Sequence, residues 1–297
     1  VYKRQDLRQS REWEVEDPSA GTYRAWRLST PEEIRWKGPG GEMLEGWAYP
    51  ALGGAGEDAP LVVNYYGGAV PMQRDFSFTH QWLAANGYRV LVLNTRGAYG
   101  WGDDFADHHA GDWGPESAAD VLSGVKAYLK DHPRAKMGIY GGSYGGFLTQ
   151  YILTLSDDFD AAVSRKGISS LASYWGQGEW GWTYGDMSLG GALPWDDREL
   201  FVGHSPLYRA DRIDTPLLLL HGQADRNVPP GESLQLFTAL KMQGKPVEMV
   251  TLPGEDHSFQ TTYAHWVDHW QLLLDWFDRW LKDQPQAWEA RWQEEED

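Results

Sequence analysis

The run KMGIYGGSYGG at residues 136–146 decides the fold that we expect for this chain. Residues 136–140 have the pattern of a short strand. Two glycines precede Ser143, and two more follow it after Tyr144. A sharp turn from a strand into a helix needs residues with almost no side chain, because bulk there would collide with the neighbouring strand and helix. Such a turn holds the Ser143 hydroxyl exposed at a helix N-terminus, where developing negative charge is favoured. Ser143 is therefore a candidate nucleophile.

Strand and helix signals alternate along the rest of the chain. Strand signals fall at residues 61–66, 89–94, 136–140, 161–164, 216–221 and 247–252. Helical signals fall at residues 76–86, 116–130, 147–155, 231–243 and 262–282, and a hairpin signal covers residues 33–37 and 44–49. This alternation predicts an α/β fold, with a doubly wound, mostly parallel sheet and helices on both faces. Together with the turn at Ser143, it predicts an α/β-hydrolase catalytic domain over residues 31–297.

Residues 1–30 differ from the rest of the chain. They are polar and weakly periodic, so we expect a tail or linker there. The chain begins with Val1 rather than Met, and the lack of a secretory signal therefore indicates little about its compartment. Cytoplasmic and exported locations both stay open.

Composition narrows the classes of function. The chain has 297 residues, of which 41% are hydrophobic, enough for a sizeable core. Its net charge of −17 repels phosphate backbones, so we expect no nucleic-acid partner. No apolar run approaches the roughly 18–20 residues that a membrane span needs, so we expect no membrane partner. The absence of cysteine removes thiol catalysis, disulfides and cysteine-based zinc sites.

A serine nucleophile needs a base, and the base needs an acid that orients it. Asp225 follows the strand signal at 216–221, and His257 follows the one at 247–252. Both lie just past strand ends, so a parallel sheet would bring them to the edge that carries Ser143. Their order along the chain is serine, acid, histidine, which is the order of the α/β-hydrolase fold. We expect the three residues to form a catalytic triad.

Less specific explanations exist for several of these residues. A serine between glycines is often only a turn residue. Asp225 could serve only to form an Asx-turn, in which its side chain bonds to the nearby backbone. Asp256 adjoins His257, but its side chain should point elsewhere, which makes it a poor substitute for Asp225. His265 and His269 have a spacing that can hold zinc. No third ligand is evident, so we expect packing or exposure there, and neither a metal nor another cofactor.

The reaction also needs donors for the oxyanion that forms when the serine attacks a carbonyl. The backbone N–H of Tyr144, directly after Ser143, is the natural first donor. The second donor usually comes from the loop after an early strand, which here has the sequence NYYGG at residues 64–68. Either an amide of that loop or the Tyr66 hydroxyl can donate, and the sequence leaves both open.

Further runs occur in a fixed order along the chain. They are YGG at 66–68, NTRGAYGWG at 94–102, GDWG at 111–114, GGSYGG at 141–146, SPL at 205–207, HGQADRNVP at 221–229, FTAL at 237–240 and GEDHSF at 254–259. Over nearly all of residues 31–283, the chain resembles the prolyl oligopeptidase family of serine peptidases, in particular its acylaminoacyl-peptidase and dipeptidyl-peptidase-like branches. So many ordered matches are far more specific than the glycine–serine motif alone.

The resemblance implies hydrolysis of short peptides through the triad, with Tyr66 donating its hydroxyl to the oxyanion. It also implies that Asn227 binds a carbonyl of the substrate. The pocket for the residue at the cleaved bond would be lined by Val228, Tyr174 and Trp175. Packing is an equally good explanation for each of the two aromatic side chains. We expect a short peptide as the partner, and self-association of the chain stays open.

Members of this family normally carry an N-terminal β-propeller that restricts entry to short peptides. Residues 1–30 are then expected to be the end of such a propeller. A carboxylesterase is the main alternative, because it would share every catalytic residue and differ only in its pocket. A non-catalytic binding module of the same fold is a weaker alternative, since the triad is complete. The motifs do not distinguish an exopeptidase from an endopeptidase.

Overall fold

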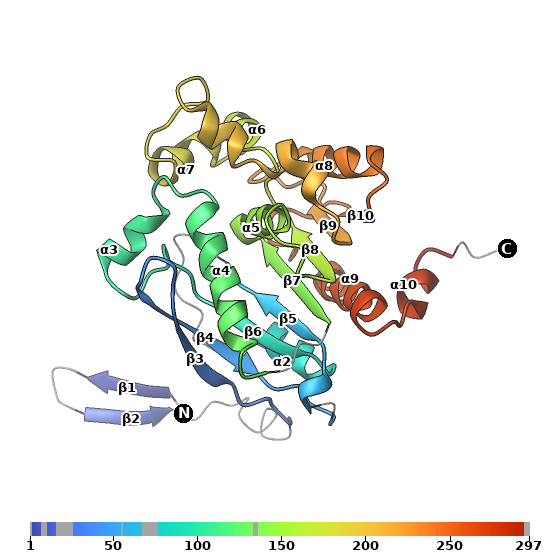
Figure 1. The fold of residues 1–297 in the computed structure, drawn as a ribbon. Helices are drawn as coiled ribbons and strands as arrows, with labels where there is room; N and C mark the ends of the chain where they lie inside the picture. Colours follow the sequence, from blue (N-terminus) through green and yellow to red (C-terminus); the bar gives the residue numbers. More distant parts are fainter. Residues whose placement is uncertain are drawn as a thin grey trace.

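The fold is built on a sheet of eight strands, seen here in a computed structural model (Figure 1). The structure describes residues 2–6, 11–15, 26–54, 56–66, 77–132 and 136–293. In chain order the strands of this sheet are β3 (Glu32–Lys37), β4 (Met43–Tyr49), β5 (Leu61–Asn64), β6 (Arg89–Leu93), β7 (Met137–Gly142), β8 (Ala161–Arg165), β9 (Leu217–Gly222) and β10 (Val247–Leu252). Their order across the sheet is β10-β9-β8-β7-β5-β6-β4-β3.

Most of the sheet is parallel. Strands β5 to β10 run parallel to one another, while β4 pairs antiparallel with β6 and forms an antiparallel hairpin with the edge strand β3. The doubly wound, mostly parallel sheet and the hairpin are therefore confirmed. Strand β7 runs to Gly142 rather than to residue 140, because Gly141 and Gly142 still pair with Ser164 and Arg165 of β8.

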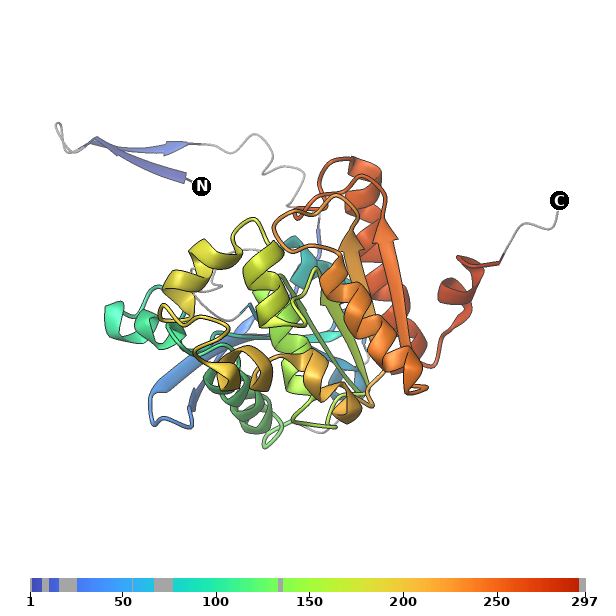
Figure 2. The ribbon, with the colours of Figure 1, turned by 90° about the horizontal axis from the view of Figure 1, so that it is seen from above.

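Helices cover both faces of the sheet. The described helices are α2 (Phe78–Ala85), α3 (Asp103–Ala106), α4 (Pro115–Tyr128), α5 (Tyr144–Leu153), α6 (Leu171–Gln177), α7 (Gly181–Ser188), α8 (Gly231–Met242), α9 (Tyr263–Leu281) and α10 (Gln286–Ala290). Helices α4, α5 and α8 pack on one face, where Val121, Phe147 and Leu236 belong to one buried cluster. Helices α2 and α9 pack on the other face, where Leu83 and Leu273 belong to a second cluster. Helices α8 and α9 thus lie on opposite faces of β9 (Figure 2).

Strand β9 shows how the sequence supplies both clusters. All four residues from Leu217 to Leu220 are fully buried. Successive side chains of a strand point to opposite faces. Accordingly, Leu217 and Leu219 lie in the first cluster, and Leu218 and Leu220 lie in the second. Each such leucine contributes about 1.5–3 kcal/mol relative to an exposed one, so a continuous apolar run stabilises a strand that is covered on both sides.

Residues 1–30 contain a second, smaller sheet. Strands β1 (Tyr2–Asp6) and β2 (Arg11–Val15) pair with each other in antiparallel register and do not join the eight-stranded sheet. The residue pattern predicted a tail or linker here, because these short polar segments lack the apolar alternation from which a strand is recognised. The family resemblance implied the end of a propeller. The division of the chain near residue 30, and a propeller before it, stay predictions.

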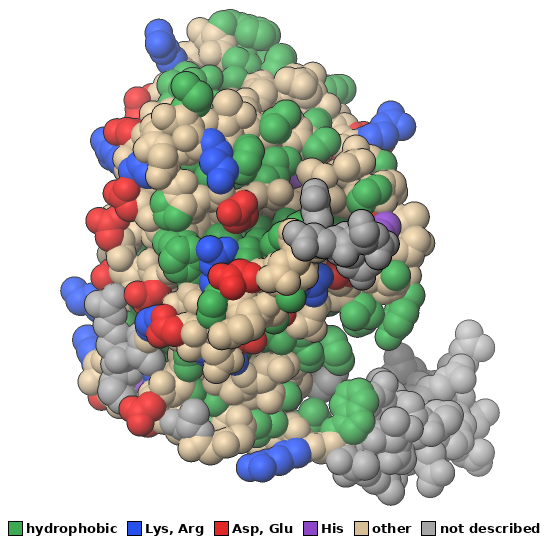
Figure 3. Space-filling view, turned by 90° about the vertical axis from the view of Figure 1, so that its right-hand side faces the viewer, with side chains coloured by type: hydrophobic (Ala, Val, Ile, Leu, Met, Phe, Trp, Pro, Cys, Tyr) green, Lys and Arg blue, Asp and Glu red, His purple; other side chains and the backbone are tan. Residues whose placement is uncertain are grey.

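The surface seen in Figure 3 carries both signs of charge. Lys and Arg side chains are interspersed there with Asp and Glu, and the described part of this face has no broad basic patch. This face therefore offers no continuous match to a phosphate backbone. Among the helices that the structure describes, none has both the length and the apolar character required to cross a membrane.

A buried ion pair holds the loop that follows β6 to helix α4. Arg96 is 6% exposed, and its Nη2 and Nε donate to the two oxygens of Asp120 over 2.9 and 3.0 Å. The backbone N–H of Arg96 donates to the same fully buried carboxylate over 2.9 Å. Glu42 and Glu116 flank the guanidinium at 3.0 and 3.3 Å. The pair therefore anchors the β6–α4 connection at the carboxyl edge of the sheet.

We predict that Asp120→Ala destabilises the protein by about 3 kcal/mol or more, because it leaves the Arg96 guanidinium buried without its main partner. Chemical denaturation followed by tryptophan fluorescence measures the change in the free energy of unfolding. Lys126→Ala, at an exposed position on the same helix, is the control and should stay within about 0.5 kcal/mol of the parent. Equal free energies of unfolding for the two variants would contradict this role of the ion pair.

Candidate active site

Ser143 lies in a tight turn between β7 and α5. Its backbone has φ 59° and ψ −122°, which is the left-handed side of φ space. The neighbouring glycines make this turn possible. A Cβ on Gly141 would collide with the Gly145 oxygen, and a Cβ on Gly146 would lie 2.7 Å from the Arg165 oxygen. Side chains at these positions would therefore force the strand and the helix apart, as the sequence predicted.

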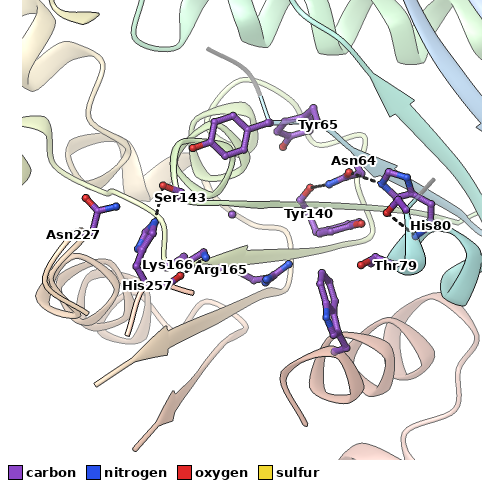
Figure 4. Close-up of a pocket in the computed structure, with 14 residues that line it drawn as sticks. Asn64, Tyr65, Thr79, His80, Tyr140, Ser143, Arg165, Lys166, Asn227 and His257 are labelled. Atoms are coloured by element: carbon purple, nitrogen blue, oxygen red, sulfur yellow. Dashed lines mark hydrogen bonds between the residues drawn. The ribbon is translucent and has the colours of Figure 1, made fainter. Parts of the chain in front are cut away.

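The structure brings Ser143, His257 and Asp225 together at the carboxyl edge of the sheet. Figure 4 shows Ser143 beside His257. His257 Nε2 lies 3.0 Å from Ser143 Oγ, and His257 Nδ1 lies 2.7 Å from Asp225 Oδ2. Asp225 follows β9 and His257 follows β10, and these strands are neighbours in the sheet. Ser143 and Asp225, which are 114 and 32 positions from His257 in the sequence, thus contact it in the folded chain.

The surroundings set the protonation states of the acid and the base. Burial lowers the pKa of His257 more than the Asp225 carboxylate raises it. Burial raises the pKa of Asp225, but hydrogen bonds from two histidines and a backbone amide outweigh this effect and hold that pKa well below its usual range. At neutral pH, His257 is therefore neutral and its Nδ1–H donates to a carboxylate. Its Nε2 is left to accept the proton of Ser143.

A second histidine, which the sequence did not single out, supports the acid. His221 is fully buried, and its Nε2 donates to the Val228 oxygen over 2.8 Å and lies 3.4 Å from Asp225 Oδ2. Its Nδ1 accepts from the Ser233 hydroxyl over 2.7 Å. The Val228 N–H donates to Asp225 Oδ1 over 2.9 Å. These contacts fix the carboxylate in the orientation that directs its Oδ2 to His257.

Both named candidates for oxyanion donors lie beside Ser143. Tyr144 is the first residue of α5, so its N–H has no acceptor within the helix. Burial raises the pKa of Tyr66 more than its hydrogen bond with Ser143 lowers it, so the Tyr66 hydroxyl stays protonated and is able to donate. The Tyr144 side chain is itself buried, and its hydroxyl donates to the Asp112 carbonyl over 3.3 Å. Of the alternative amides in the loop at residues 64–68, those of residues 67–68 lie outside the described residues.

A pocket of about 540 Å³ opens at Ser143 (Figure 4). Its walls come from the ends of β5, β7 and β8, from the start of α2, from α9 and from the loops that carry Asn227 and His257. Asn227 is the residue expected to bind a substrate carbonyl. Its Oδ1 is buried and has no hydrogen-bond partner among the described residues. The side-chain amide of Asn227 is therefore open to a hydrogen bond from a bound molecule.

The other three residues expected to bind substrate make packing contacts. The ring of buried Tyr174 lies 5.9 Å from that of Trp113, and the ring of Trp175 meets that of Trp195 edge to face at 5.8 Å. The Val228 side chain is buried in the hydrophobic core. In the described part of the chain, none of the three predicted residues lines this pocket. Their role in substrate binding stays a prediction.

The histidines at zinc spacing are engaged in other contacts. His265 Nδ1 lies 2.7 Å from Glu255 Oε1, and the buried His269 donates from Nδ1 to the His265 carbonyl over 3.1 Å. Within the described ranges, no group of three or more His, Asp or Glu side chains is placed to hold a metal. Asp256 accepts from the amide and the hydroxyl of Ser258 at 2.8 and 2.6 Å, so its carboxylate is used within its own loop.

Two cations in the pocket were missed by reasoning from the sequence. Arg165 and Lys166 line the pocket at the carboxyl end of β8, beside Ser143. A signal for them exists, because both follow the strand predicted at residues 161–164 and parallel strands end at one edge. No motif surrounds them, however, and charged side chains are most often solvated on a surface.

Comparison with known proteins relates this arrangement to one family. Residues 74–284 match the prolyl oligopeptidase family. The uncharacterized peptidase YuxL of Bacillus subtilis is 34% identical over 262 residues, which are 86% of this chain and 40% of that protein. Dipeptidyl-peptidase 5 of Porphyromonas endodontalis is 29% identical over 261 residues, which are 80% of this chain and 37% of that protein. The chain thus spans about two fifths of the length of these relatives.

A solved structure shares both the fold and part of the sequence. The acylaminoacyl peptidase of Pyrococcus horikoshii matches with a TM-score of 0.85 and 30% sequence identity, over 91% of this chain and 45% of that one. This likeness confirms the predicted α/β-hydrolase fold. The family match over residues 74–284 confirms the predicted relationship. The chain belongs to the prolyl oligopeptidase family.

Proposed function

We propose that this chain forms the catalytic domain of a serine peptidase that hydrolyses short peptides through an acyl-enzyme on Ser143. One observation supports this most directly: His257 connects Ser143 Oγ to the Asp225 carboxylate over 3.0 and 2.7 Å. A carboxylesterase would use the same three residues. The names of the relatives, a dipeptidyl-peptidase and an acylaminoacyl peptidase, favour a peptide as the substrate.

The contacts suggest a step for each residue. His257 Nε2 removes the proton of the Ser143 hydroxyl as Oγ attacks the carbonyl carbon of the substrate. The carbonyl oxygen becomes an oxyanion and accepts hydrogen bonds from the Tyr66 hydroxyl and the Tyr144 N–H. The His257 imidazolium, stabilised by Asp225, gives its proton to the leaving amine, and the acyl group stays on Ser143. Water, deprotonated by His257, then hydrolyses the acyl-enzyme and releases the Ser143 hydroxyl.

Asn227 is assigned to the acyl part of the substrate. Its side-chain amide lines the pocket and has an oxygen without a protein partner among the described residues. An amide can donate to a peptide carbonyl and accept from a peptide N–H. The resemblance to dipeptidyl peptidases at this position favours a hydrogen bond from Asn227 Nδ2 to a carbonyl that precedes the cleaved bond, and Oδ1 is left to accept from a peptide N–H.

We predict that Ser143→Ala abolishes labelling by a fluorophosphonate probe and hydrolysis of a peptide anilide, because it removes the only nucleophile proposed for both reactions. Probe labelling is read by mass spectrometry, and hydrolysis is read as release of the aniline. Ser156→Ala, past the far end of α5, is the matched control and should retain both activities. Turnover of an aryl ester without any cleavage of the anilide would instead favour the carboxylesterase.

We predict that Tyr66→Phe lowers kcat on a peptide anilide by on the order of 10–1000-fold, because it removes one donor to the oxyanion. Tyr65→Phe is a matched control on the adjacent residue. The Tyr65 hydroxyl is buried against Thr149 at 2.9 Å, so its loss should affect stability and leave kcat close to the parent value. An unchanged kcat in Tyr66→Phe would move the donor role to a backbone amide.

We predict that kcat/KM falls at acidic pH through a group with a pKa below 6.5, because only neutral His257 can accept the Ser143 proton. Burial lowers the pKa of His257 from the ordinary value of 6.5, so the active, neutral form persists further into acid than it would for a free histidine. The profile of kcat/KM against pH, measured with an anilide that does not titrate in this range, gives this pKa. A midpoint above pH 6.5 would contradict the assignment.

A further inference from the structure

Arg165 and Lys166 form a pair of cations in the pocket, directly beside the nucleophile. Arg165 pairs with Gly142 across β7 and β8, and its carbonyl oxygen accepts the Ser143 N–H over 2.9 Å. Lys166 Cε lies 3.6 Å from the position that a Cβ on Gly142 would occupy. Lys166 Nζ donates a hydrogen bond to the carbonyl oxygen of His257. The pair is therefore in contact with the segments that carry the nucleophile and the base.

Aromatic rings, rather than carboxylates, hold these cations in place. The guanidinium carbon of Arg165 lies 4.1 Å from the ring centre of Trp270 and 5.8 Å from that of Phe259. Lys166 Nζ lies 5.2 Å from the Phe259 ring centre. No Asp or Glu among the described residues forms an ion pair with either cation. Contacts with ring faces position a cation while leaving its N–H donors open to a ligand.

One donor of the pair lacks a partner, and another meets only a neutral ring. Arg165 Nε is buried and has no hydrogen-bond partner within the described part of the chain, and Arg165 Nη2 lies 3.3 Å from His269 Nε2. Burial lowers the pKa of His269 to about 3, and its Nδ1–H is given to the His265 carbonyl. His269 Nε2 is therefore a neutral acceptor, and the guanidinium meets no negative charge there.

The pair carries an electrostatic penalty that a bound anion would relieve. Burial, and then the charge of Arg165, lower the pKa of Lys166 to about 7, although Asp225 and Asp256 act in the opposite direction. Two like charges in a partly desolvated pocket repel each other, and an anion between them would offset this repulsion. A carboxylate suits the pair because the donors of an arginine and a lysine are able to engage its two oxygens together.

The position of the pair indicates which part of a substrate it meets. In Figure 4, Asn227 and Arg165 lie on opposite sides of the Ser143–His257 pair. Asn227 is assigned to the acyl part of the substrate, so Arg165 and Lys166 face the part that leaves as the amine. Lys166 also contacts the backbone of His257, the residue that protonates this amine.

We propose that Arg165 and Lys166 bind the free C-terminal carboxylate of the leaving fragment, and thereby select short peptides that end one or two residues beyond the cleaved bond. This inference rests on the proposed peptidase function. One extended residue spans about 3.3–3.6 Å. The carboxylate of a leaving fragment of this length therefore reaches side chains that lie against His257, whereas a longer fragment would carry its carboxylate past them.

Three peptides that share their sequence up to the last residue test this inference on the protein. Two have identical sequences with two residues beyond the cleaved bond, one ending in a free carboxylate and the other in an amide. We expect kcat/KM for the acid to exceed that for the amide by about 10–100-fold, the range of one or two charge-assisted hydrogen bonds. The third peptide is amidated and ends in aspartate, so its only carboxylate at that end is on a side chain. It shows whether the site requires a C-terminal carboxylate or accepts any carboxylate nearby. Equal values for acid and amide, or a preference conferred only by the aspartate, would overturn the inference.

Variants at the two cations give a second readout, the ratio of kcat/KM for the acid to that for the amide. This ratio should fall toward one in Arg165→Gln and in Lys166→Gln, because each variant removes one charge. Lys166→Arg keeps the charge and should therefore keep most of the preference for the acid over the amide. A purely structural role of Lys166 would not predict that this preference depends on the charge. Lys126→Gln, an exposed lysine on α4, is the control and should keep the parental ratio. A parental ratio in both glutamine variants would overturn the inference.

Failure of this inference is distinguishable from failure of the proposed function. Fluorophosphonate labelling of Ser143 shows whether each variant is folded and retains its nucleophile. If a labelled protein cleaves neither a peptide anilide nor any of the three peptides, both proposals fail. If the anilide is cleaved through Ser143 and the acid and the amide react equally, only the carboxylate site fails.

Discussion

The close approach of strand β7 to helix α5 is the constraint on which the rest of the site depends. A side chain on Gly141 would collide with the Gly145 oxygen, so the two elements meet more closely than any other residue allows. This approach holds Ser143 at φ 59° and turns its hydroxyl into the pocket. It also makes Tyr144 the first residue of α5, with an N–H that the helix does not use. One turn thus supplies both the proposed nucleophile and a proposed donor for the oxyanion.

The remaining groups reach this turn because parallel strands end at the same edge. Strands β8, β9 and β10 follow one another in the sheet next to β7, and they are followed by a cation, the acid and the base. Neighbouring strands lie about 4.8 Å apart, so side chains from adjacent strand ends come within hydrogen-bond distance. His257 is where these groups meet, through its ring with Ser143 and Asp225 and through its carbonyl with Lys166. A change at any of them therefore acts on the same residue, through its ring or through its backbone.

The charge beside the nucleophile is opposite to that of the chain. The net charge is −17, yet two cations line the pocket and the Asp225 carboxylate is occupied by its own donors. Exposed charges are screened beyond about 8–10 Å at physiological ionic strength. The charges near Ser143, which include Arg165 and Lys166, therefore matter more to this pocket than distant exposed charges do. The carboxylate site that we propose therefore lies next to the proposed nucleophile of an acidic protein.

Local patterns were enough to predict the sheet, the turn and the meeting of the triad. The strand signal at residues 247–252 predicted β10 with its observed bounds, and the glycines predicted the turn. Positions just past strand ends predicted that Asp225 and His257 lie at the edge that carries Ser143. The side-chain directions of Tyr65 and Tyr66 depended on tertiary contacts, because residues beyond a strand end follow no period that sets their direction. The contacts of Arg165 could not be predicted from the sequence either. The ring that holds its guanidinium belongs to Trp270, on a helix more than a hundred residues further along the chain. Short-range periodicity encodes strands and turns, whereas the environment of a charge is created only when distant segments pack together.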